Sequence, residues 1–338
     1  MFIKKSEGKN ISNKNLIMTK EKLNPYWISG YVDSEGSFIF SINKDKRTKF
    51  GLSFRARFQI GVHESDKFIL YRIKEYFNDV GSVRKNKSYY YYIVDNVKDI
   101  DTVIIPHFEI YPLLTFNKFR SFYLLKECIK ITKATKSIQE NKNKNIGKKI
   151  GFWNYNLTKE EFVKLLSYKA TFKLGFKAKI FDNVDKTLNL ETITIPYSSN
   201  LAINPYWLAG FVAGDGSFGC YKRGDKYKNY YCSFRISQNV IDISLLVLIQ
   251  KYLKCGKVFK FKNGMCDLSV YAIEDLNKVI VPFFINYKLE TSKEKDFICF
   301  QEILNVFNKK GFRTEWKKED LQIIKDLILS MNNYRRKI

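Results

Sequence analysis

A fifteen-residue stretch is written twice in this chain, and the repetition limits the folds that the chain can adopt. The first copy, NPYWISGYVDSEGSF, begins at Asn24, and the second, NPYWLAGFVAGDGSF, begins at Asn204. Three further pairs of segments also resemble each other: FQIGVHESD from Phe58 and FRISQNVID from Phe234, VIIPHFEIYPLLT from Val103 and VIVPFFINYKLET from Val279, and LTKEEF from Leu157 and WKKEDL from Trp316. Because each copy of such a repeat forms one structural unit, the sequence predicts two similar domains.

The repeat also sets the expected domain boundaries. The expected segments are a disordered basic leader (1–23), an N-terminal domain (24–176), a linker (177–203) and a C-terminal domain (204–338). In each copy the hydrophobic pattern predicts a helix, two strands, a helix, two strands and further helices. This order predicts an α+β fold of two pseudo-symmetric αββαββα domains, in which helices cover one face of each antiparallel sheet.

The charge balance of the chain limits its partners. Lys and Arg number 59 against 34 Asp and Glu, so the formal net charge is +25. This excess predicts a polyanionic partner, which DNA, RNA or an anionic membrane surface would satisfy. The sequence has no run of about 18 apolar residues, so no membrane span is expected. The six Cys form no Cys-x-x-Cys pair and the only His are His63 and His107, which argues against a zinc site and a His-based triad.

The outward positions of the predicted strands carry side chains that can bind nucleic acid. In the segment FRARFQI the apolar residues face one side, and Arg55, Arg57 and Gln59 face the other. Arg and Gln side chains hold phosphates and read base edges, although a merely solvated basic face is the alternative. The candidate DNA-binding residues are Ser37, Ile39, Ser41, Asn43, Arg55, Arg57, Gln59, Arg84, Ser217, Tyr221, Arg223, Ser233, Arg235 and Ser237.

Capping signals at both ends of the repeated stretch predict that it forms a helix. Asn24 and Asn204 are favourable N-cap residues, and a Pro follows each at the first helical position. Gly36 and Gly216 are placed to end the two helices as left-handed residues.

Small residues on the repeated helix predict a close helix pair. Gly30 and Ser34 lie four residues apart, as do Gly210 and Gly214, so each pair shares a helix face. Small residues let two backbones approach, so we expect these four at the domain interface. The large residues are expected to anchor each helix in its own domain; they are Trp27, Tyr31, Trp207 and Phe211.

Such packing places two carboxylates side by side. Glu35 and Asp215 end the two helices, where the helix dipole and their mutual repulsion both disfavour negative charge. Divalent cations would relieve this, and Mg²⁺ suits oxygen ligands and phosphodiester hydrolysis. Asp33 is acidic only in the first copy, since Ala213 holds the second position, and we expect a structural role for it. The alternative for one such acid alone is an ordinary helix-ending turn.

The motifs ISGYVDSEG and LAGFVAGDG resemble the paired motifs of single-chain LAGLIDADG homing endonucleases, over residues 24–338. The resemblance implies two sheets that form a saddle over DNA, with Glu35 and Asp215 binding divalent metal at the scissile phosphates. Mg²⁺ or Mn²⁺ would support cleavage, and Ca²⁺ binding alone. It also implies catalytic helpers at Lys293, at Lys118 after a one-residue shift, and at Gln238. The counterpart of Gln238 is Val62, which departs from the family pattern.

The function expected from this resemblance is site-specific double-strand cleavage of a DNA site of about 20 bp by a monomer. One alternative is an intron maturase, which binds intron RNA and assists splicing. A second is a DNA-binding regulator without catalysis. Mitochondrial localisation is expected, with the chloroplast as the alternative.

Overall fold

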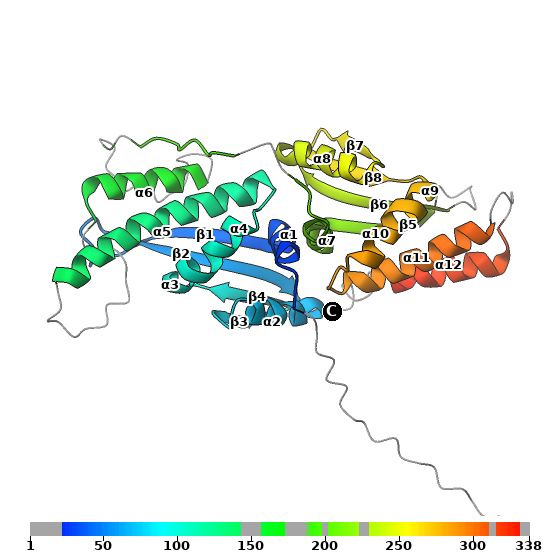
Figure 1. Cartoon of the computed structure of the whole chain (residues 1–338), viewed down its shortest axis with the longest axis horizontal. Helices are drawn as coiled ribbons and strands as arrows, with labels where there is room; N and C mark the ends of the chain where they lie inside the picture. Colours follow the sequence, from blue (N-terminus) through cyan, green and yellow to red (C-terminus); the bar gives the residue numbers. More distant parts are fainter. Residues whose placement is uncertain are drawn as a thin grey trace, which may run out of the picture.

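Two similar units lie side by side in the computed structural model and meet at a central pair of helices (Figure 1). The structure describes residues 22–142, 157–172, 188, 190–197, 202–222, 230–310 and 316–331, with backbone alone for 134–142. The expected leader lies outside the described residues apart from its last two positions, and so do much of the expected linker and the predicted DNA contact Arg223.

Each unit follows the predicted element order. The first contains α1 (Pro25–Glu35), β1 (Gly36–Lys44), β2 (Leu52–His63), η1 (Glu64–Asp66), α2 (Lys67–Tyr76), β3 (Ser82–Asn86), β4 (Tyr89–Val94), α3 (Val97–Asp99), η2 (Ile100–Ile104), α4 (Ile105–Ile110), α5 (Phe116–Lys142) and α6 (Lys159–Phe172). The second contains α7 (Pro205–Asp215), β5 (Gly216–Lys222), β6 (Tyr230–Asn239), η4 (Val240–Asp242), α8 (Ile243–Leu253), β7 (Lys257–Lys260), β8 (Met265–Val270), α9 (Ile273–Asp275), η5 (Leu276–Ile280), α10 (Val281–Asn286), α11 (Lys293–Lys310) and α12 (Lys318–Ser330). The predicted α+β fold is therefore confirmed.

Both sheets are antiparallel and have equivalent strand orders, β1-β2-β4-β3 and β5-β6-β8-β7. Alternate strand residues face the helices, as Phe38 opposite Phe58 and Phe218 opposite Phe234 illustrate. The helices of each unit pack on this inner face of its sheet (Figure 1). The other face carries the alternate, more exposed residues of the strands.

Glycines let the two central helices touch through their backbones. A Cβ on Gly30 would overlap the Trp207 carbonyl oxygen, and a Cβ on Gly210 would overlap that of Trp27. Farther along, a Cβ on Gly214 would collide with the Ser34 side chain. The four predicted interface residues thus lie between α1 and α7, which cross at their small-residue faces.

The prediction of left-handed glycines at the ends of these helices is wrong. Gly36 has φ −78° and ψ 161°, and Gly216 has φ −81° and ψ 159°, both extended conformations. Each helix runs straight into the first strand of its sheet, so no reversing residue is needed. Glycine still matters, because a Cβ on Gly36 would lie 2.7 Å from the Val32 carbonyl oxygen.

The expectation that each large aromatic residue anchors only its own unit is also wrong for Trp207. Its indole Nε1 donates a hydrogen bond of 2.8 Å to Asp33 of the other unit. The equivalent indole of Trp27 is buried and has no hydrogen-bond partner among the described residues. Ala213 replaces the aspartate at that position, which explains the difference. At this pair of equivalent positions the contact is therefore polar on one side of the pseudo-twofold axis and apolar on the other.

Two aspartates cap helices across the interface in a reciprocal manner. Asp66 in η1 accepts hydrogen bonds from the Ser292 backbone N–H at 2.6 Å and from its hydroxyl at 2.9 Å, at the start of α11. Asp242 in η4 accepts from the Phe116 N–H at 2.6 Å, at the start of α5. The two pairs occupy equivalent repeat positions. Each unit thus satisfies orphan helix donors of the other and fixes their relative orientation.

These reciprocal caps support a stability prediction. Asp66→Ala and Asp242→Ala should each lower the free energy of unfolding by roughly 2 kcal/mol, because each removes a charge-assisted hydrogen bond that is partly shielded from water. Urea unfolding checks this, with Glu274→Ala as the control, since the Glu274 side chain is 73% exposed and its ion pair is with an equally exposed lysine, Lys278, in the helix next to it. Equal effects from all three variants would contradict the capping role.

None of the described helices is both long enough and apolar enough to cross a membrane.

Candidate active site and nucleic-acid face

The two motif carboxylates lie at adjacent helix ends. Glu35 is the last residue of α1, and Asp215 is the last residue of α7. A Cβ built on Gly214 would stand 3.2 Å from the Cγ of Glu35, so the acid of one unit borders the helix end of the other. Both carboxylates also act electrostatically on Lys118. The structure therefore brings the two predicted metal ligands to one place.

Two lysines, Lys293 buried and Lys118 partly buried, neutralise the same two helix ends. The Lys293 ammonium donates to the carbonyls of Val212, Gly214 and Gly216 at 3.0, 2.6 and 2.6 Å. Helix C-termini carry partial negative charge, which disfavours a carboxylate there. An ammonium at the same helix end offsets this effect of the dipole.

Lys118 occupies the equivalent place in the first unit. Its ammonium donates to the carbonyls of Ser34, at 3.3 Å, and Gly36, which match Gly214 and Gly216 in the repeat. The one-residue shift in sequence thus leaves the ammonium on equivalent carbonyls. Burial lowers the pKa of Lys118, and the nearby carboxylates oppose that shift.

One carboxylate has a partner that the repeat does not duplicate. Gln238, near the end of β6, donates a hydrogen bond of 2.6 Å to Oδ2 of Asp215. Burial raises the pKa of Asp215, while the Gln238 amide and the two lysines favour its ionised form. Val62 at the equivalent position of β2 is buried and apolar, so it cannot orient Glu35 in this way. The two halves of the site are chemically unequal.

Asp33 is buried and has a structural role, because it binds the loop before α5 and the other unit. Its two oxygens accept from the Leu114 N–H, from the Thr115 N–H and hydroxyl, and from the Trp207 indole, at 2.8 to 3.1 Å. All of its acceptor positions are used in binding the loop before α5 and the other unit. In the second unit Glu294 takes over part of this role by accepting from the Leu289 N–H.

The site offers few protein ligands for a metal. The described residues contain no group of three or more His, Cys, Asp or Glu side chains that could hold an ion. Two carboxylates at buried helix ends nevertheless supply hard oxygen donors whose charge is poorly solvated. A divalent cation bound there would complete its coordination with water, backbone oxygens or phosphate oxygens.

The outward faces of the sheets carry most of the predicted nucleic-acid contacts. In the first unit Arg57 and Arg84 both approach Asp95, at 3.7 and 3.8 Å, and remain about half exposed. The other predicted positions described on this face are Ser37, Ile39, Ser41, Asn43, Arg55 and Gln59, all exposed or partly exposed.

The second sheet presents Ser217, Tyr221, Arg235 and Ser237 on its outward face. Ser233 is on the same face but only 2% exposed, which contradicts its expected role as a DNA contact. It lies opposite Gly219 in the register, and the Tyr221 ring folds back over Gly219. The serine hydroxyl is therefore covered by its larger neighbours.

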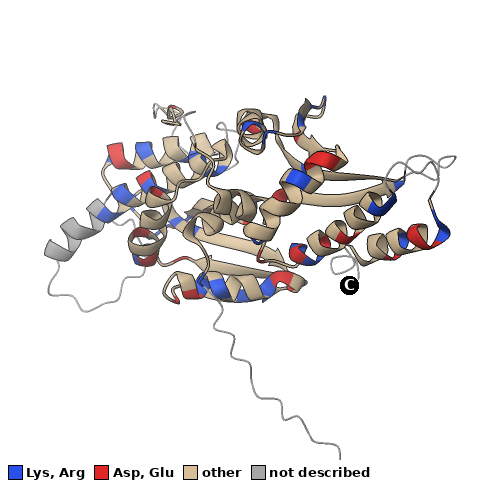
Figure 2. Cartoon of the chain, turned by 45° about the vertical axis from the view of Figure 1, so that its right-hand side comes forward, with Lys and Arg blue, Asp and Glu red and all other residues tan. Residues whose placement is uncertain are grey.

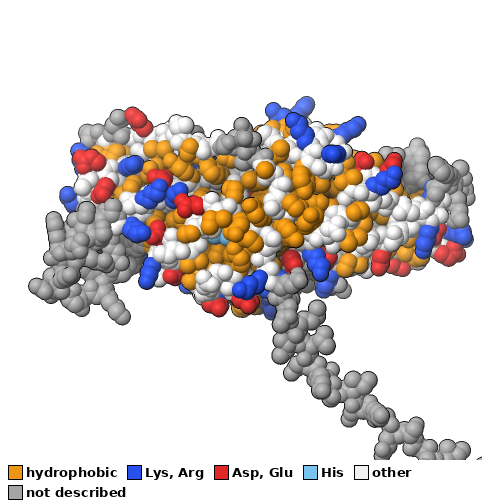
Figure 3. All heavy atoms as spheres, viewed as in Figure 1, with side chains coloured by type: hydrophobic (Ala, Val, Ile, Leu, Met, Phe, Trp, Pro, Cys, Tyr) orange, Lys and Arg blue, Asp and Glu red, His pale blue; other side chains and the backbone are white. Residues whose placement is uncertain are grey.

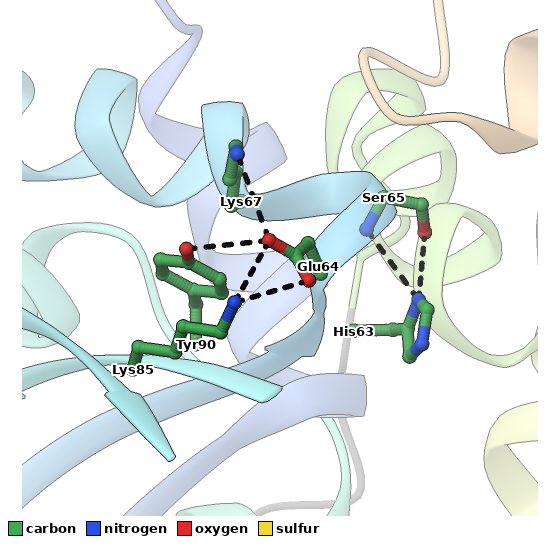
Figure 4. Close-up of polar contacts among 6 residues, drawn as sticks. All are labelled: His63, Glu64, Ser65, Lys67, Lys85 and Tyr90. Carbon is green, nitrogen blue, oxygen red and sulfur yellow. Dashed lines mark hydrogen bonds and ion pairs between the residues drawn. The ribbon is translucent and has the colours of Figure 1, made fainter. Parts of the chain in front are cut away.

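The first unit carries an acid at the end of β2 where the second has Val240. Figure 4 shows Glu64 between Lys67, Lys85 and Tyr90. Lys85 Nζ lies 3.2 and 3.3 Å from the two carboxylate oxygens, and Lys67 Nζ lies 3.8 Å from one of them. The hydrogen bond from Lys85 is the main cause that lowers the pKa of Glu64. Because Lys67 and Lys85 compensate its negative charge, Glu64 does not prevent this end of the sheet from binding a polyanion.

The helices do not concentrate the positive charge of the chain. Figure 2 shows Lys and Arg interspersed with Asp and Glu along the long helices of both units. On the helix-covered face drawn in Figure 3, hydrophobic side chains fill the centre, and Lys and Arg lie mostly towards its edges. Among the described residues, the outward sheet faces are the better candidates for binding a polyanion.

Comparison with known proteins decides the family. The model of the family described as LAGLIDADG endonuclease matches the chain twice, over residues 28–129 and 208–304. The chain belongs to the LAGLIDADG endonuclease family. Each match begins inside α1 or α7 and covers the sheet of that unit, so the predicted resemblance is confirmed.

Two curated relatives of this LAGLIDADG protein are fungal proteins. It is 32% identical over 304 residues to "Probable intron-encoded endonuclease 2" of Neurospora crassa, a match covering 87% of this chain and 62% of that protein. It is 25% identical over 371 residues to "Uncharacterized mitochondrial protein RF1" of Saccharomyces cerevisiae, covering 99% of this chain and 67% of the relative. The chain thus spans about three-fifths of the first relative's length.

Solved LAGLIDADG structures share the fold across almost the whole chain. I-SmaMI bound to an uncleaved DNA target with calcium ions is 27% identical, with a TM-score of 0.77, covering 92% of this chain and 99% of that chain. The homing endonuclease I-GzeII in complex with its DNA target is 29% identical, with a TM-score of 0.78, covering 93% of this chain and all of the other.

Sequence reasoning missed several residues that shape this LAGLIDADG site. Asp66 and Asp242 share one repeat position, so the repeat itself carried a signal for the reciprocal caps. Asp95 directly follows β4, and Asp267 lies in β8. Each of these two aspartates pairs with an arginine on the outward face of its sheet. No short-range pattern in the sequence pointed to these two, because their partners lie on neighbouring strands.

Proposed function

We propose that this LAGLIDADG protein is a site-specific DNA endonuclease that hydrolyses one phosphodiester in each strand of an asymmetric site of about 20 bp. The observation that carries the proposal is the equivalent setting of Glu35 and Asp215. Each ends a motif helix, each borders the other unit, and a lysine ammonium neutralises each helix end. Such symmetry suits two phosphodiesters related by the twofold axis of a duplex.

The cofactor we propose is a divalent cation, Mg²⁺ or Mn²⁺, held by Glu35 and Asp215. Bound there, it would supply Lewis acidity and lower the pKa of a water molecule for attack on phosphorus. The raised pKa of Asp215 fits this proposal, because a buried carboxylate gains stability from a cation. The neighbour I-SmaMI was crystallised with uncleaved DNA and calcium ions, which is consistent with Ca²⁺ supporting binding alone.

The protein's own groups have distinct roles in this proposal. Lys118 and Lys293 hold the helix ends that present the carboxylates, and their positive charge also attracts the phosphates. Gln238 fixes the orientation of one Asp215 oxygen. The outward sheet residues bind the duplex on either side and place its two scissile phosphates at the carboxylate pair.

The partner we propose is double-stranded DNA, bound by a single copy of the chain, since one chain supplies both motif regions. We also propose a mitochondrial location, because relatives are described as intron-encoded or mitochondrial proteins of fungi.

The direct test is selection of cleavable sites from a randomised duplex library by the purified protein in Mg²⁺. Double-strand cuts within one long asymmetric sequence are the expected result, and EDTA should abolish them. Failure to recover any cleaved sequence, together with tight binding of structured intron RNA at moderate salt, would replace the endonuclease with a splicing cofactor.

The inequality of the two half-sites leads to a kinetic prediction. Gln238→Ala should slow cleavage of one strand roughly tenfold, because it removes a charge-assisted hydrogen bond to Asp215. The variant should therefore accumulate nicked plasmid during cleavage of a supercoiled substrate, which gel electrophoresis measures. Gln322→Ala, an exposed change on α12, serves as the control. If Gln238→Ala slows both strands equally or neither, Gln238 does not act through one half-site.

A further inference from the structure

The outward faces of the two sheets differ most at positions that the repeat makes equivalent. Alignment of the strands by their registers pairs Ser41 with Tyr221, Arg55 with Tyr231, Arg84 with Phe259, and Asp95 with Tyr271. The first unit thus carries hydrogen-bonding and charged groups at positions where the second carries aromatic rings. All four of these changes run in the same direction, whereas the equivalent pair Tyr91 and Asp267 runs in the other.

The three tyrosines of the second sheet form a continuous cluster. Tyr221 on β5 and Tyr231 on β6 are directly paired, with ring centroids 5.5 Å apart. Tyr271, just after β8, extends the cluster, with its ring centroid 6.2 Å from that of Tyr231. We call Tyr221, Tyr231 and Tyr271 the tyrosine cluster. Mutual packing restricts the rotamers of these rings and makes the cluster a preorganised surface.

The tyrosine cluster is not part of the hydrophobic core. The neighbouring residues Cys220 and Cys232 face the helices and are buried, so the tyrosines point to the other side of the sheet. Tyr221 and Tyr271 are each 43% exposed, and Phe259 on the same face is 40% exposed. Large exposed rings on the face that is proposed to bind DNA need an apolar partner in the complex.

The arginine on this face of the second sheet already has partners within the protein. Arg235 approaches the Asp267 carboxylate at 3.5 Å and the Tyr271 hydroxyl at 3.4 Å. On the described part of the face it is the single arginine, and an acid already compensates its charge. In the first unit three arginines share one face, Arg55, Arg57 and Arg84, and the last two both approach one acid, Asp95.

We propose that the two halves of the DNA site are read by different chemistry, with the tyrosine cluster reading thymine methyl groups in the half bound by the second unit. The proposal rests on the proposed function as a DNA endonuclease. In the major groove thymine alone offers a methyl group, and apolar side chains recognise it by contact. The arginines of the first unit suit guanine, which accepts two hydrogen bonds from one guanidinium.

The proposal also places the thymines within the site. Tyr221 and Tyr231 lie five residues along their strands from the pair Gly216–Ile236, which adjoins the carboxylates. At about 3.3 Å per residue, the cluster lies roughly 17 Å from the start of β5. The preferred thymines therefore lie about five base pairs from the centre of cleavage, in one half of the site only.

The test begins with site selection by the full chain in Mg²⁺. Wild type is compared with Tyr231→Ser and with the matched variant Arg55→Ser at the equivalent position. Tyr231→Ser should relax base preference in one half and Arg55→Ser in the other, which assigns each half to its unit. Circular dichroism verifies that both variants are folded.

Single thymines in the half assigned to the second unit are then replaced by uracil, which removes the methyl group and keeps every hydrogen bond. Wild-type affinity, measured in Ca²⁺, should fall about fourfold for a contacted methyl, the loss expected for one buried methyl group. Tyr231→Ser should bind the thymine and uracil duplexes equally, whereas Tyr221→Phe should retain discrimination because its ring remains.

The outcomes separate the inference from the function on which it rests. If wild type cleaves a defined site but tolerates uracil equally in both halves, the methyl-reading role is overturned while the endonuclease function stands. If no site is cleaved or selectively bound, the proposed function itself fails, and this proposal fails with it.

Discussion

Glu35→Gln should lower the rate of double-strand cleavage by at least about a thousandfold while leaving DNA binding intact. The change removes one of the two carboxylates that end α1 and α7, yet it preserves the size of the side chain. A bound cation supplies several kcal/mol of transition-state stabilisation, and about 4 kcal/mol corresponds to a thousandfold in rate. Asp215→Asn should have an effect of the same order.

Single-turnover cleavage of a supercoiled plasmid measures this loss, and gel shift in Ca²⁺ measures binding separately. Glu109→Gln is a suitable control. Glu109 lies on α4, not at the ends of α1 and α7, and its exposed side chain pairs with Lys126 on α5. The loss of one partly buried negative charge should leave affinity for DNA unchanged or slightly higher. Double-strand cleavage by Glu35→Gln at a wild-type rate would remove Glu35 from the catalytic site.

Gly30→Ala and Gly210→Ala should each destabilise the chain by about 3 kcal/mol and abolish most cleavage. At both positions the added methyl group meets the backbone of the opposite helix, which cannot swing aside as a side chain can. The two helices would have to separate, and the carboxylates at their ends would separate with them. For a chain of this size the midpoint of thermal unfolding should fall by about 5 °C or more.

Differential scanning calorimetry with Gly61→Ala as the matched control distinguishes this effect from a general cost of replacing glycine. The atoms nearest to a Cβ on Gly61 belong to the ring of Tyr91, a partly exposed side chain that can shift. Gly61→Ala should therefore change the midpoint much less. A small effect at Gly30 and Gly210 would show that the helices can part without loss of stability.

Local sequence signals predicted the motif helices and strands well. Asn24 caps α1 by accepting from the Tyr26 N–H, and α1 and α7 have the predicted bounds, because capping, proline position and hydrophobic alternation all act over a few residues. The left-handed glycines were mispredicted because the usual helix-ending signal assumes a reversal of the chain, and here Gly36 continues into β1.

Long-range features of the site were beyond local reasoning. The indole of Trp207 crosses to Asp33, 174 residues away in sequence, and no periodicity indicates such a contact. Ser233 was assigned to the DNA face by alternation, correctly for its side of the sheet, but its burial depends on the Tyr221 ring on a neighbouring strand. Lys118 is the opposite case. It is shifted by one residue from Lys293 in the alignment, yet its ammonium binds the carbonyls equivalent to those that Lys293 binds.

The central claim is that Glu35 and Asp215 together hold divalent metal at the scissile phosphates. Anomalous X-ray diffraction from crystals of the DNA complex grown with Mn²⁺ tests it most directly, because the signal locates the metal independently of the protein model. We expect Mn²⁺ peaks within about 2.5 Å of carboxylate oxygens of both residues and of phosphate oxygens. Metal peaks elsewhere in a cleavage-competent complex, with Glu35 and Asp215 unligated, would contradict it.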